Sequence, residues 1–383
     1  MKKATLPILS ISIALLMSTS AEAAQSLLSD SIVVYRVGTG ANSLVNTGNS
    51  AFLDEYSRTG TLIQSIDLGI VASGTASSEG FINRSGDGRY IIATGYASTG
   101  SISITGSTGT LNARVIARID ASGNVDSTTR LSNYSSGNNP RSAWSADGSS
   151  FYGVGGTGGI VYANLGATTG TAVTPTGAGL LSNMRVIDVY NNQLYASSNS
   201  GAFRLATTGG APASTTGQTL LNLPGWSTSA GSPYAYFLAD LNSAVAGLDT
   251  AYVADDALGL LKYSLVGGTW TLNGTIGAAG GSGDLYRGLD AEIVGGSVNI
   301  FATRKGGTAA AGGGELVMIT DTAGYNAAFS TTTPTLLATA AANTAFRGVS
   351  LSTVPEPSSA ALLGIGMVAL VAVRALRRNR EDS

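Results

Sequence analysis

The chain has 383 residues, of which 43% are hydrophobic and only 11% are charged, and its formal net charge is −2. It contains no cysteine, which excludes a disulfide framework, thiol nucleophiles and cysteine-ligated metal sites. It contains no histidine either, which removes the usual general base near neutral pH and excludes a Ser-His-Asp triad within one chain. The central part of the sequence has no basic patch, so we expect no nucleic-acid partner.

The N-terminus has the three parts of a secretory signal peptide. Lys2 and Lys3 form a charged start, residues 8–17 are apolar, and Ala21 and Ala23 occupy the small-residue positions of a cleavage site. We predict a signal peptide over residues 1–23, cut after Ala23 by signal peptidase, and a body over residues 24–354. An uncleaved anchor helix is the alternative, but the apolar run is shorter than the ~20 residues that span a bilayer.

The body consists of short apolar or aromatic stretches separated by Gly, Asn or Asp turns, and no long helical periodicity interrupts them. This pattern, with 52 glycines in the chain, predicts short strands joined by tight turns. The candidate strands cover residues 32–37, 51–56, 61–67, 90–96, 114–120, 151–155, 159–164, 185–190, 193–197, 251–254, 259–265, 291–294, 298–303, 315–320 and 347–352.

Two features recur along the body. The motif Ser-x-Asp-Gly occurs at residues 85–88 and 145–148, and Asp-Gly between two strands is a strong hairpin signal. An arginine also recurs near the start of successive units, which are spaced by roughly 44 to 62 residues, long enough for four strands. The units begin near Glu79, Arg141, Arg185, Tyr234, Arg287 and Arg347.

These units predict an all-β fold, a β-propeller with six blades, in which the last strand pairs with the first segment and closes the ring. Seven blades is an alternative, because residues 79–131 can be divided differently. A right-handed β-helix and a β-sandwich are the alternative architectures. The body resembles a group of bacterial secreted propellers that have Gly-rich blades and Asp-Gly hairpins and no assigned activity.

The recurring charged residues are expected at equivalent positions of the inner strands, around the channel. Arginines there could bind a carboxylate or an anionic sugar, because a guanidinium grips such groups with two hydrogen bonds. Alternatively, each arginine pairs with an acid and locks adjacent blades together, and this structural interpretation is the one we favour. The residues concerned are Glu79, Arg141, Arg185, Arg287 and Arg347.

Acidic residues offer two further interpretations. Asp240, Asp255 and Asp256 could bind Ca²⁺ through oxygen ligands, but they lack a calcium-loop spacing and a turn role explains Asp255 and Asp256 equally. Otherwise no cofactor is expected. The pairs at 54–55 and 290–292 could serve as glycosidase carboxylates, although such pairs are common.

The C-terminus has three consecutive features. Pro355, Glu356 and Pro357 come first, an apolar stretch over residues 358–373 follows, and an arginine-rich end closes the chain. We predict a single transmembrane helix over 358–373, short enough that flanking side chains must reach to the interface. The arginines should stay on the cytoplasmic side, which leaves the body outside. They are Arg374, Arg377, Arg378 and Arg380.

This tail resembles the PEP-CTERM sorting signal of Gram-negative bacteria. The resemblance covers residues 355–383 and implies an exosortase, a membrane-embedded enzyme, as the partner that recognises Pro355–Pro357 and processes the chain there. It also implies export, anchoring on the outer side of the inner membrane, and then a place at the cell surface or in the extracellular matrix of a biofilm-forming bacterium. A plain tail anchor is the alternative.

The sequence therefore predicts a non-catalytic surface or matrix protein that binds exopolysaccharide, another glycan or a protein. The alternative is an extracellular Ca²⁺-dependent hydrolase or a glycan-cleaving enzyme.

Overall fold

The structure is a computed structural model that describes residues 25–174, 182–201, 203–277 and 284–353. Apart from one short 3-10 helix, η1 (Ile104–Gly106), the regular structure in these ranges is β-strand. The predicted all-β class is therefore confirmed, and each stretch predicted to be a strand overlaps a strand of the structure.

The largest sheet has nine strands and divides into two groups that are joined by a single residue pair, Val71 with Tyr96. A two-residue strand, β22 (Gly312–Gly313), runs parallel to the edge of the first group. The first group has the order β25 (Thr344–Leu351), β1 (Ser31–Val37), β2 (Asn49–Ser57) and β3 (Leu62–Ala72). The second group has the order β4 (Asn83–Arg84), β5 (Tyr90–Tyr96), β6 (Arg114–Asp120) and β7 (Val125–Leu131).

Four further sheets each contain four strands, and neighbouring strands in each are antiparallel. They are β8 (Pro140–Trp144), β9 (Ser150–Gly155), β10 (Val161–Asn164) and β11 (Thr171–Ala172); β12 (Met184–Tyr190), β13 (Gln193–Ser198), β14 (Leu205–Thr207) and β15 (Leu221–Asn222); β16 (Pro233–Ala239), β17 (Thr250–Asp255), β18 (Gly259–Val266) and β19 (Thr269–Ile276); and β20 (Gly288–Val294), β21 (Ser297–Arg304), β23 (Glu315–Asp321) and β24 (Thr335–Thr339).

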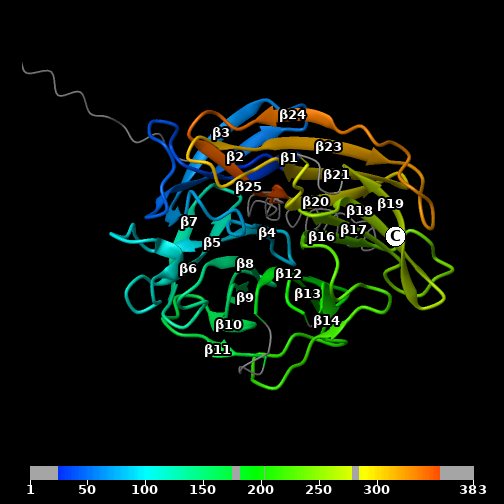
Figure 1. Cartoon of the computed structure of the whole chain (residues 1–383), viewed down its shortest axis with the longest axis horizontal. Coiled ribbons are helices and arrows are strands. Elements are labelled where there is room, and N and C mark those ends of the chain that lie inside the picture. The colour runs from blue at the N-terminus through cyan, green and yellow to red at the C-terminus, as the bar shows by residue number, and fades with distance from the viewer. Residues whose placement is uncertain (1–24, 175–181, 202, 278–283, 354–383) are drawn as a thin grey trace, which may run out of the picture.

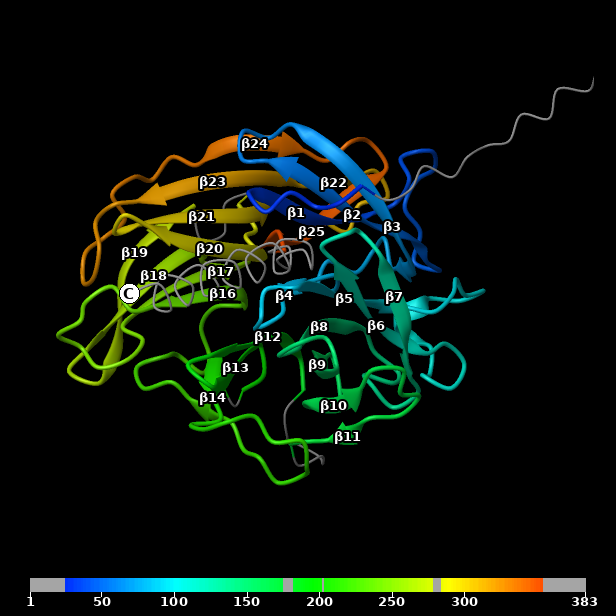
Figure 2. The same ribbon diagram turned by 180° about the vertical axis from the view of Figure 1, so that it is seen from behind.

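One strand of each group lies toward the centre of the molecule (Figures 1 and 2). These inner strands are β25, β4, β8, β12, β16 and β20, and each contacts the next in that order, while β20 contacts β25. The contacts therefore form a closed circuit. All residues of β8 and β25 are buried, as expected for strands covered on both faces.

The predicted Asp-Gly turns connect inner strands to their neighbours. After β4, Asp87 Oδ1 accepts hydrogen bonds from Ser85 Oγ at 2.6 Å and from the Arg89 N–H at 3.1 Å, and Gly88 supplies a φ of +78°. The turn between β8 and β9 repeats this arrangement, with Ser149 N–H donating to Asp147 at 2.9 Å. The sequence folds into a hairpin at both places because a carboxylate and a left-handed glycine are supplied where the chain reverses.

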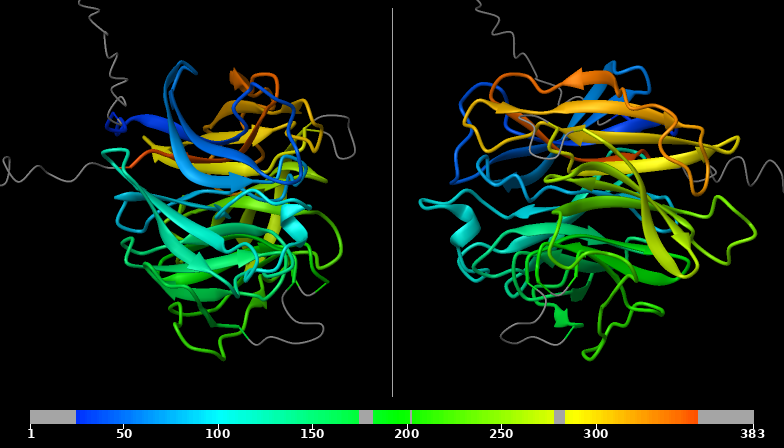
Figure 3. Two further views of the ribbon diagram at one scale, coloured as in Figure 1. Left: turned by 90° about the vertical axis from the view of Figure 1, so that its left-hand side faces the viewer. Right: turned by 45° about the vertical axis from the view of Figure 1, so that its right-hand side comes forward.

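The first and last described strands lie side by side in one sheet. β25 pairs antiparallel with β1 from Ile32 with Leu351 to Val37 with Ala345, and the Ser352 N–H donates to the Ser31 carbonyl oxygen at 3.1 Å. This confirms the predicted pairing of the two terminal strands. In side view, the blue N-terminal strands accordingly lie beside the orange and red C-terminal strands (Figure 3).

A buried ion pair links two neighbouring sheets. Lys262 Nζ on β18 lies 2.6 Å from Asp321 Oδ2 on β23, and both side chains are 0% exposed. Tyr252 Oη also donates to Asp321 at 2.7 Å, and Lys262 donates to the Gly324 carbonyl oxygen at 2.7 Å. Because its hydrogen-bonding groups are satisfied, this pair can be buried without leaving an uncompensated charge.

The closed circuit makes a steric prediction at Gly348 on β25. A Cβ there would lie 2.6 Å from the Ile82 nitrogen and 2.8 Å from the Gly80 carbonyl oxygen, which are backbone atoms that cannot turn aside. We expect Gly348→Val to lower the free energy of unfolding by about 1–3 kcal/mol or more through overpacking, measured by denaturant titration. The control is Gly106→Ala, where a Cβ meets nothing within 4 Å. Equal stability of both variants would contradict close packing of β25 against the segment before β4.

Candidate functional site

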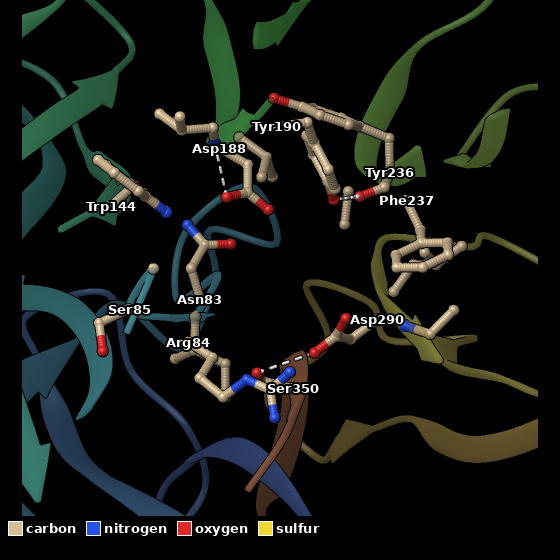
Figure 4. A pocket seen from close by; sticks show the side chains of 17 residues that line it. Asn83, Arg84, Ser85, Trp144, Asp188, Tyr190, Tyr236, Phe237, Asp290 and Ser350 are labelled. Atoms are coloured by element: carbon tan, nitrogen blue, oxygen red, sulfur yellow. Dashed lines mark hydrogen bonds between the residues drawn. The ribbon is translucent and has the colours of Figure 1, made fainter. Parts of the chain in front are cut away.

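The six inner strands form a ring, and they enclose a pocket at the end of its central axis toward which the strands run. It has a volume of about 170 Å³ and is lined from β4, β8, β12, β16, β20 and β25 (Figure 4). A cavity of this size holds a group comparable to a six-membered ring. The polar and aromatic side chains around it are Asn83, Arg84, Ser85, Trp144, Asp188, Tyr190, Tyr236, Phe237, Asp290 and Ser350.

Asp290 is fixed by the strand beside it. Its Oδ2 accepts hydrogen bonds from the Leu351 N–H at 2.8 Å and from Ser350 Oγ at 3.0 Å, and its Oδ1 accepts from the Ala291 N–H at 2.8 Å. Burial nevertheless raises the pKa of Asp290. This carboxylate therefore joins β20 to β25 and also faces the pocket.

Asp188 faces the same pocket from another wall, near the end of β12 (Figure 4). Its Oδ1 accepts a hydrogen bond from the Val189 N–H at 2.7 Å. Burial raises the pKa of Asp188 to about 7, and the charge on Asp290 adds to the increase. Near neutral pH, Asp188 can therefore act as a hydrogen-bond donor or as an acceptor.

Arg84 supplies the positive charge of the pocket. It extends toward Ser350 and Asp290 in Figure 4, and its Nη1 donates to the Ser352 carbonyl oxygen at 3.3 Å. Its charge opposes the increase in the pKa of both carboxyl groups. The pocket therefore combines two carboxyl groups with one guanidinium group.

Aromatic side chains complete the walls. Tyr190 Oη donates to the Tyr236 carbonyl oxygen at 3.1 Å, and the Tyr190 and Tyr236 rings lie 6.2 Å apart. The Tyr236 hydroxyl is buried and has no hydrogen-bond partner among the described residues. Aromatic faces with a few convergent polar groups are typical of small-molecule sites.

Below the pocket, the side chains of Asn83 and Phe81 cross the centre of the ring of inner strands and fill its central axis. Asn83 Nδ2, which carries two hydrogens, lies within hydrogen-bond distance of Ser142 Oγ at 3.0 Å and of the Ala143 and Ile187 carbonyl oxygens at 2.8 Å and 2.9 Å. Phe81, which is 1% exposed, packs against Tyr234 with ring centroids 5.2 Å apart. The two ends of the axis are therefore separate environments.

The charged residues predicted around the channel lie at the opposite end from the pocket. Arg141, Arg185 and Arg347 are on β8, β12 and β25, and Arg287 directly precedes β20. Arg287 pairs with Asp256, which directly follows β17, at 3.3 Å, so this ion pair links two neighbouring sheets. Glu79 is buried and accepts hydrogen bonds from the Ser73 N–H and from Tyr96 Oη, and burial raises its pKa to about 7.

Two of the three acidic residues suggested for calcium make other contacts in the structure. The Asp255 carboxylate accepts hydrogen bonds from the backbone N–H groups of Ser232, Ala257 and Leu258 at 2.8–2.9 Å. Asp256 forms an ion pair with Arg287, and Asp240 is exposed. Within the described ranges, no group of three or more acidic side chains is placed to hold a metal ion. The arrangement favours the turn role for Asp255.

In both carboxylate pairs suggested for a glycosidase, the two acidic residues have different partners. Asp54 pairs with Arg36 at 2.5 Å, and Glu55 accepts from Gln64 Nε2 at 2.7 Å, while Glu292 pairs with Arg58 away from the pocket. Asp290 does line the pocket, but the other acidic residue that lines it is Asp188, not Glu292. Asp188 and Arg84 were not predicted from the sequence. A charged residue inside the apolar run of β12 was the available signal for Asp188.

The predicted features of both chain ends lie outside the described residues. They include Ala21 and Ala23, the motif at 355–357, the span at 358–373 and the terminal arginines. Within the part of the chain that the structure describes, no helix is long and apolar enough to cross a bilayer.

Comparison with known proteins identifies the tail. Residues 353–378 match the family model described as the PEP-CTERM protein-sorting motif. This confirms the predicted sorting signal and implies export, membrane-associated sorting and an exosortase as processing partner. No curated protein matches the chain significantly.

The raised pKa of Asp188 predicts a pH-dependent stability. An unfolded Asp has a pKa near 3.9, so the folded chain holds its proton more tightly and loses stability as the pH rises from about 4 to about 7. Asn cannot ionise, so the melting temperature of Asp188→Asn minus that of the wild type should increase over this interval and then level off.

The control is Asp147→Asn, since hydrogen bonds from Ser149 lower the pKa of Asp147. Its difference from the wild type should change in the opposite direction and only below about pH 4. A difference for Asp188→Asn that stays constant from pH 4 to 8 would contradict the raised pKa.

Proposed function

We propose that the chain is an exported, exosortase-processed surface or matrix protein whose body is a six-bladed β-propeller that binds a glycan without cleaving it. In this proposal residues 1–23 are removed after Ala23, and the segment 358–373 anchors the chain until processing. The observation that carries the binding function is the pocket with Asp188, Asp290 and Arg84.

The closed circuit of inner strands supports the propeller. Each inner strand is the first of four antiparallel strands, which is the composition of a blade. Residues 79–131, which left seven blades as an alternative, contain the single group β4 to β7. The one blade that mixes both ends of the chain is the group β25, β1, β2 and β3.

The chemistry of the pocket supports a glycan ligand. Sugar hydroxyls both donate and accept, and two carboxyl groups and a guanidinium satisfy them in both senses. The rings of Trp144, Tyr236 and Phe237 offer apolar surface for the C–H face of a sugar ring. The volume of about 170 Å³ suits one terminal sugar rather than a long chain segment.

Glycan cleavage is the second candidate, and the pair Asp188 and Asp290 is the observation that favours it. A glycosidase needs one protonated and one ionised carboxyl group on either side of the bond. Asp188, with a pKa of about 7, could supply the proton. Asp290 is held by three hydrogen bonds from its own strand and from β25, which suits a positioning role better than nucleophilic attack.

A panel of neutral and acidic 4-nitrophenyl glycosides tests both candidates. We expect at least one to quench the fluorescence of Trp144 saturably and to release no 4-nitrophenolate. Arg84→Met should weaken that binding about 10- to 100-fold, since a hydrogen bond to a charged group contributes roughly 1.5–3 kcal/mol. The control is Asp67→Asn on the exposed face of β3.

Release of 4-nitrophenolate that stops in Asp188→Asn would instead establish the glycan-cleaving enzyme. If no glycoside binds the wild type, both candidates are wrong.

Processing at the tail makes a further prediction. Glu356 is the only charged residue between Thr353 and Arg374, so it is the natural contact for the enzyme that recognises the tripeptide. In a host with an exosortase, Glu356→Ala should leave most of the protein full-length in membranes, detected by immunoblot against a C-terminal tag. Glu381→Ala, beyond the arginines, is the matched control and should be processed normally. Quantitative retention of the tag in the wild type would show a plain tail anchor.

A further inference from the structure

The end of the axis opposite the pocket gathers four guanidinium groups. Arg141, Arg185 and Arg347 are only 6%, 6% and 2% exposed, and the side chain of Arg287 is 12% exposed. They are close enough that Arg141 and Arg287 each lower the pKa of Arg185, and Arg287 lowers that of Arg347. Like charges are therefore concentrated in a buried space.

Negative charge at this end balances them only in part: Asp256 and Asp255 attract Arg185, but neither forms an ion pair with it among the described residues. Among the four, and within the described residues, only Arg287 forms an ion pair, with Asp256. Glu79 attracts Arg141 and Arg347, but burial raises its pKa to about 7, so it is only partly ionised at neutral pH. The arginines stay charged, because burial lowers their pKa values only to about 9 for Arg185 and about 10 for Arg141 and Arg347.

Arg185 has the largest unused donor capacity. Its guanidinium lies 3.9 Å from the centre of the Tyr234 ring, and its Nη2 donates to Ser232 Oγ at 3.2 Å. Its Nε and Nη1 are buried and have no hydrogen-bond partner among the described residues, and the same holds for Arg347 Nε. Nη1 and Nη2 together form the end-on fork that grips a carboxylate through two parallel hydrogen bonds, and in Arg185 Nη1 is unpaired while Nη2 carries a second N–H besides the one that it donates to Ser232.

Burying an unpaired guanidinium is unfavourable by several kcal/mol unless a counter-charge arrives. Arg141, in contrast, is satisfied by Asn139 at 3.1 Å and by Asn183 at 2.6 Å. A hollow of about 10 Å³ lies beside Arg287 and Arg347. That hollow, which Arg185 does not line, admits a group of the size of a water molecule, such as one oxygen of an anion.

We propose that this end of the axis is a carboxylate-binding site, in which Arg185 grips the ligand and Arg347 and Arg287 complete its charge balance. The site is independent of the pocket with Asp188 and of the function proposed for it. Its ligand is a small free carboxylate or the carboxylate of an acidic sugar, and both share the same chemistry.

The test is the melting temperature of the purified protein in acetate, with chloride keeping the ionic strength constant. Acetate should raise the melting temperature of the wild type saturably, by roughly 2–5 °C. Arg185→Met should melt at the same or a higher temperature in acetate-free buffer, because the substitution removes an unpaired buried charge, and it should not respond to acetate. Exposed Arg130→Met is the control and should respond like the wild type.

A parallel titration with galacturonate distinguishes the sources. Equal responses to acetate and galacturonate would favour an acidic sugar, and a response to acetate alone a small free carboxylate. A response to acetate that is the same in wild type and Arg185→Met would overturn the site. If Arg185→Met does not fold, Arg347→Gln replaces it, and the absence of saturable heat when acetate is titrated into the wild type would also overturn the proposal.

Discussion

The antiparallel pairing of β25 with β1 is the interaction on which the remaining structure depends. It joins residues that are more than three hundred positions apart, and without it the row of inner strands would have two open edges. The same strand carries Arg347 to one end of the axis and Ser350 to the other. Both candidate binding environments therefore exist only when the chain has closed on itself.

The two ends of the central axis differ because all inner strands run in the same direction along it. Arg141, Arg185 and Arg287 stand at or just before the starts of their strands, whereas Asp188 and Asp290 come later in theirs. Repetition of that order places positive charge at one end and carboxyl groups at the other. Phe81 and Asn83 separate the two ends, so the charges do not neutralise each other directly.

Much of the fold could be predicted because its signals are local. Alternating apolar stretches and the Asp-Gly turns at 85–88 and 145–148 determine where strands begin and reverse. The recurring arginines could be found for the same reason. Two-residue β4 and edge strands such as β11 could not, because so short a segment has no periodicity of its own. The longer strands β7, β8, β16, β19 and β24 were also not among the predicted strands. Asp188 and Arg84 meet only through packing between sheets, and Asp255 uses its carboxylate on backbone N–H groups, which sequence spacing alone does not reveal.

The position at which the chain leaves the body has a consequence for how an anchored molecule is oriented. Ser352, whose carbonyl oxygen accepts a hydrogen bond from Arg84, comes directly before the first residue of the sorting motif. The pocket with Asp188 and Asp290 therefore lies at the end of the axis from which the chain leaves the body, and the arginine cluster lies at the opposite end. If residues 358–373 anchor the chain as proposed, the arginine cluster faces the surrounding medium and the pocket with Asp188 faces the membrane. Cutting the tail would then do more than release the protein, because it would unmask a second face for binding.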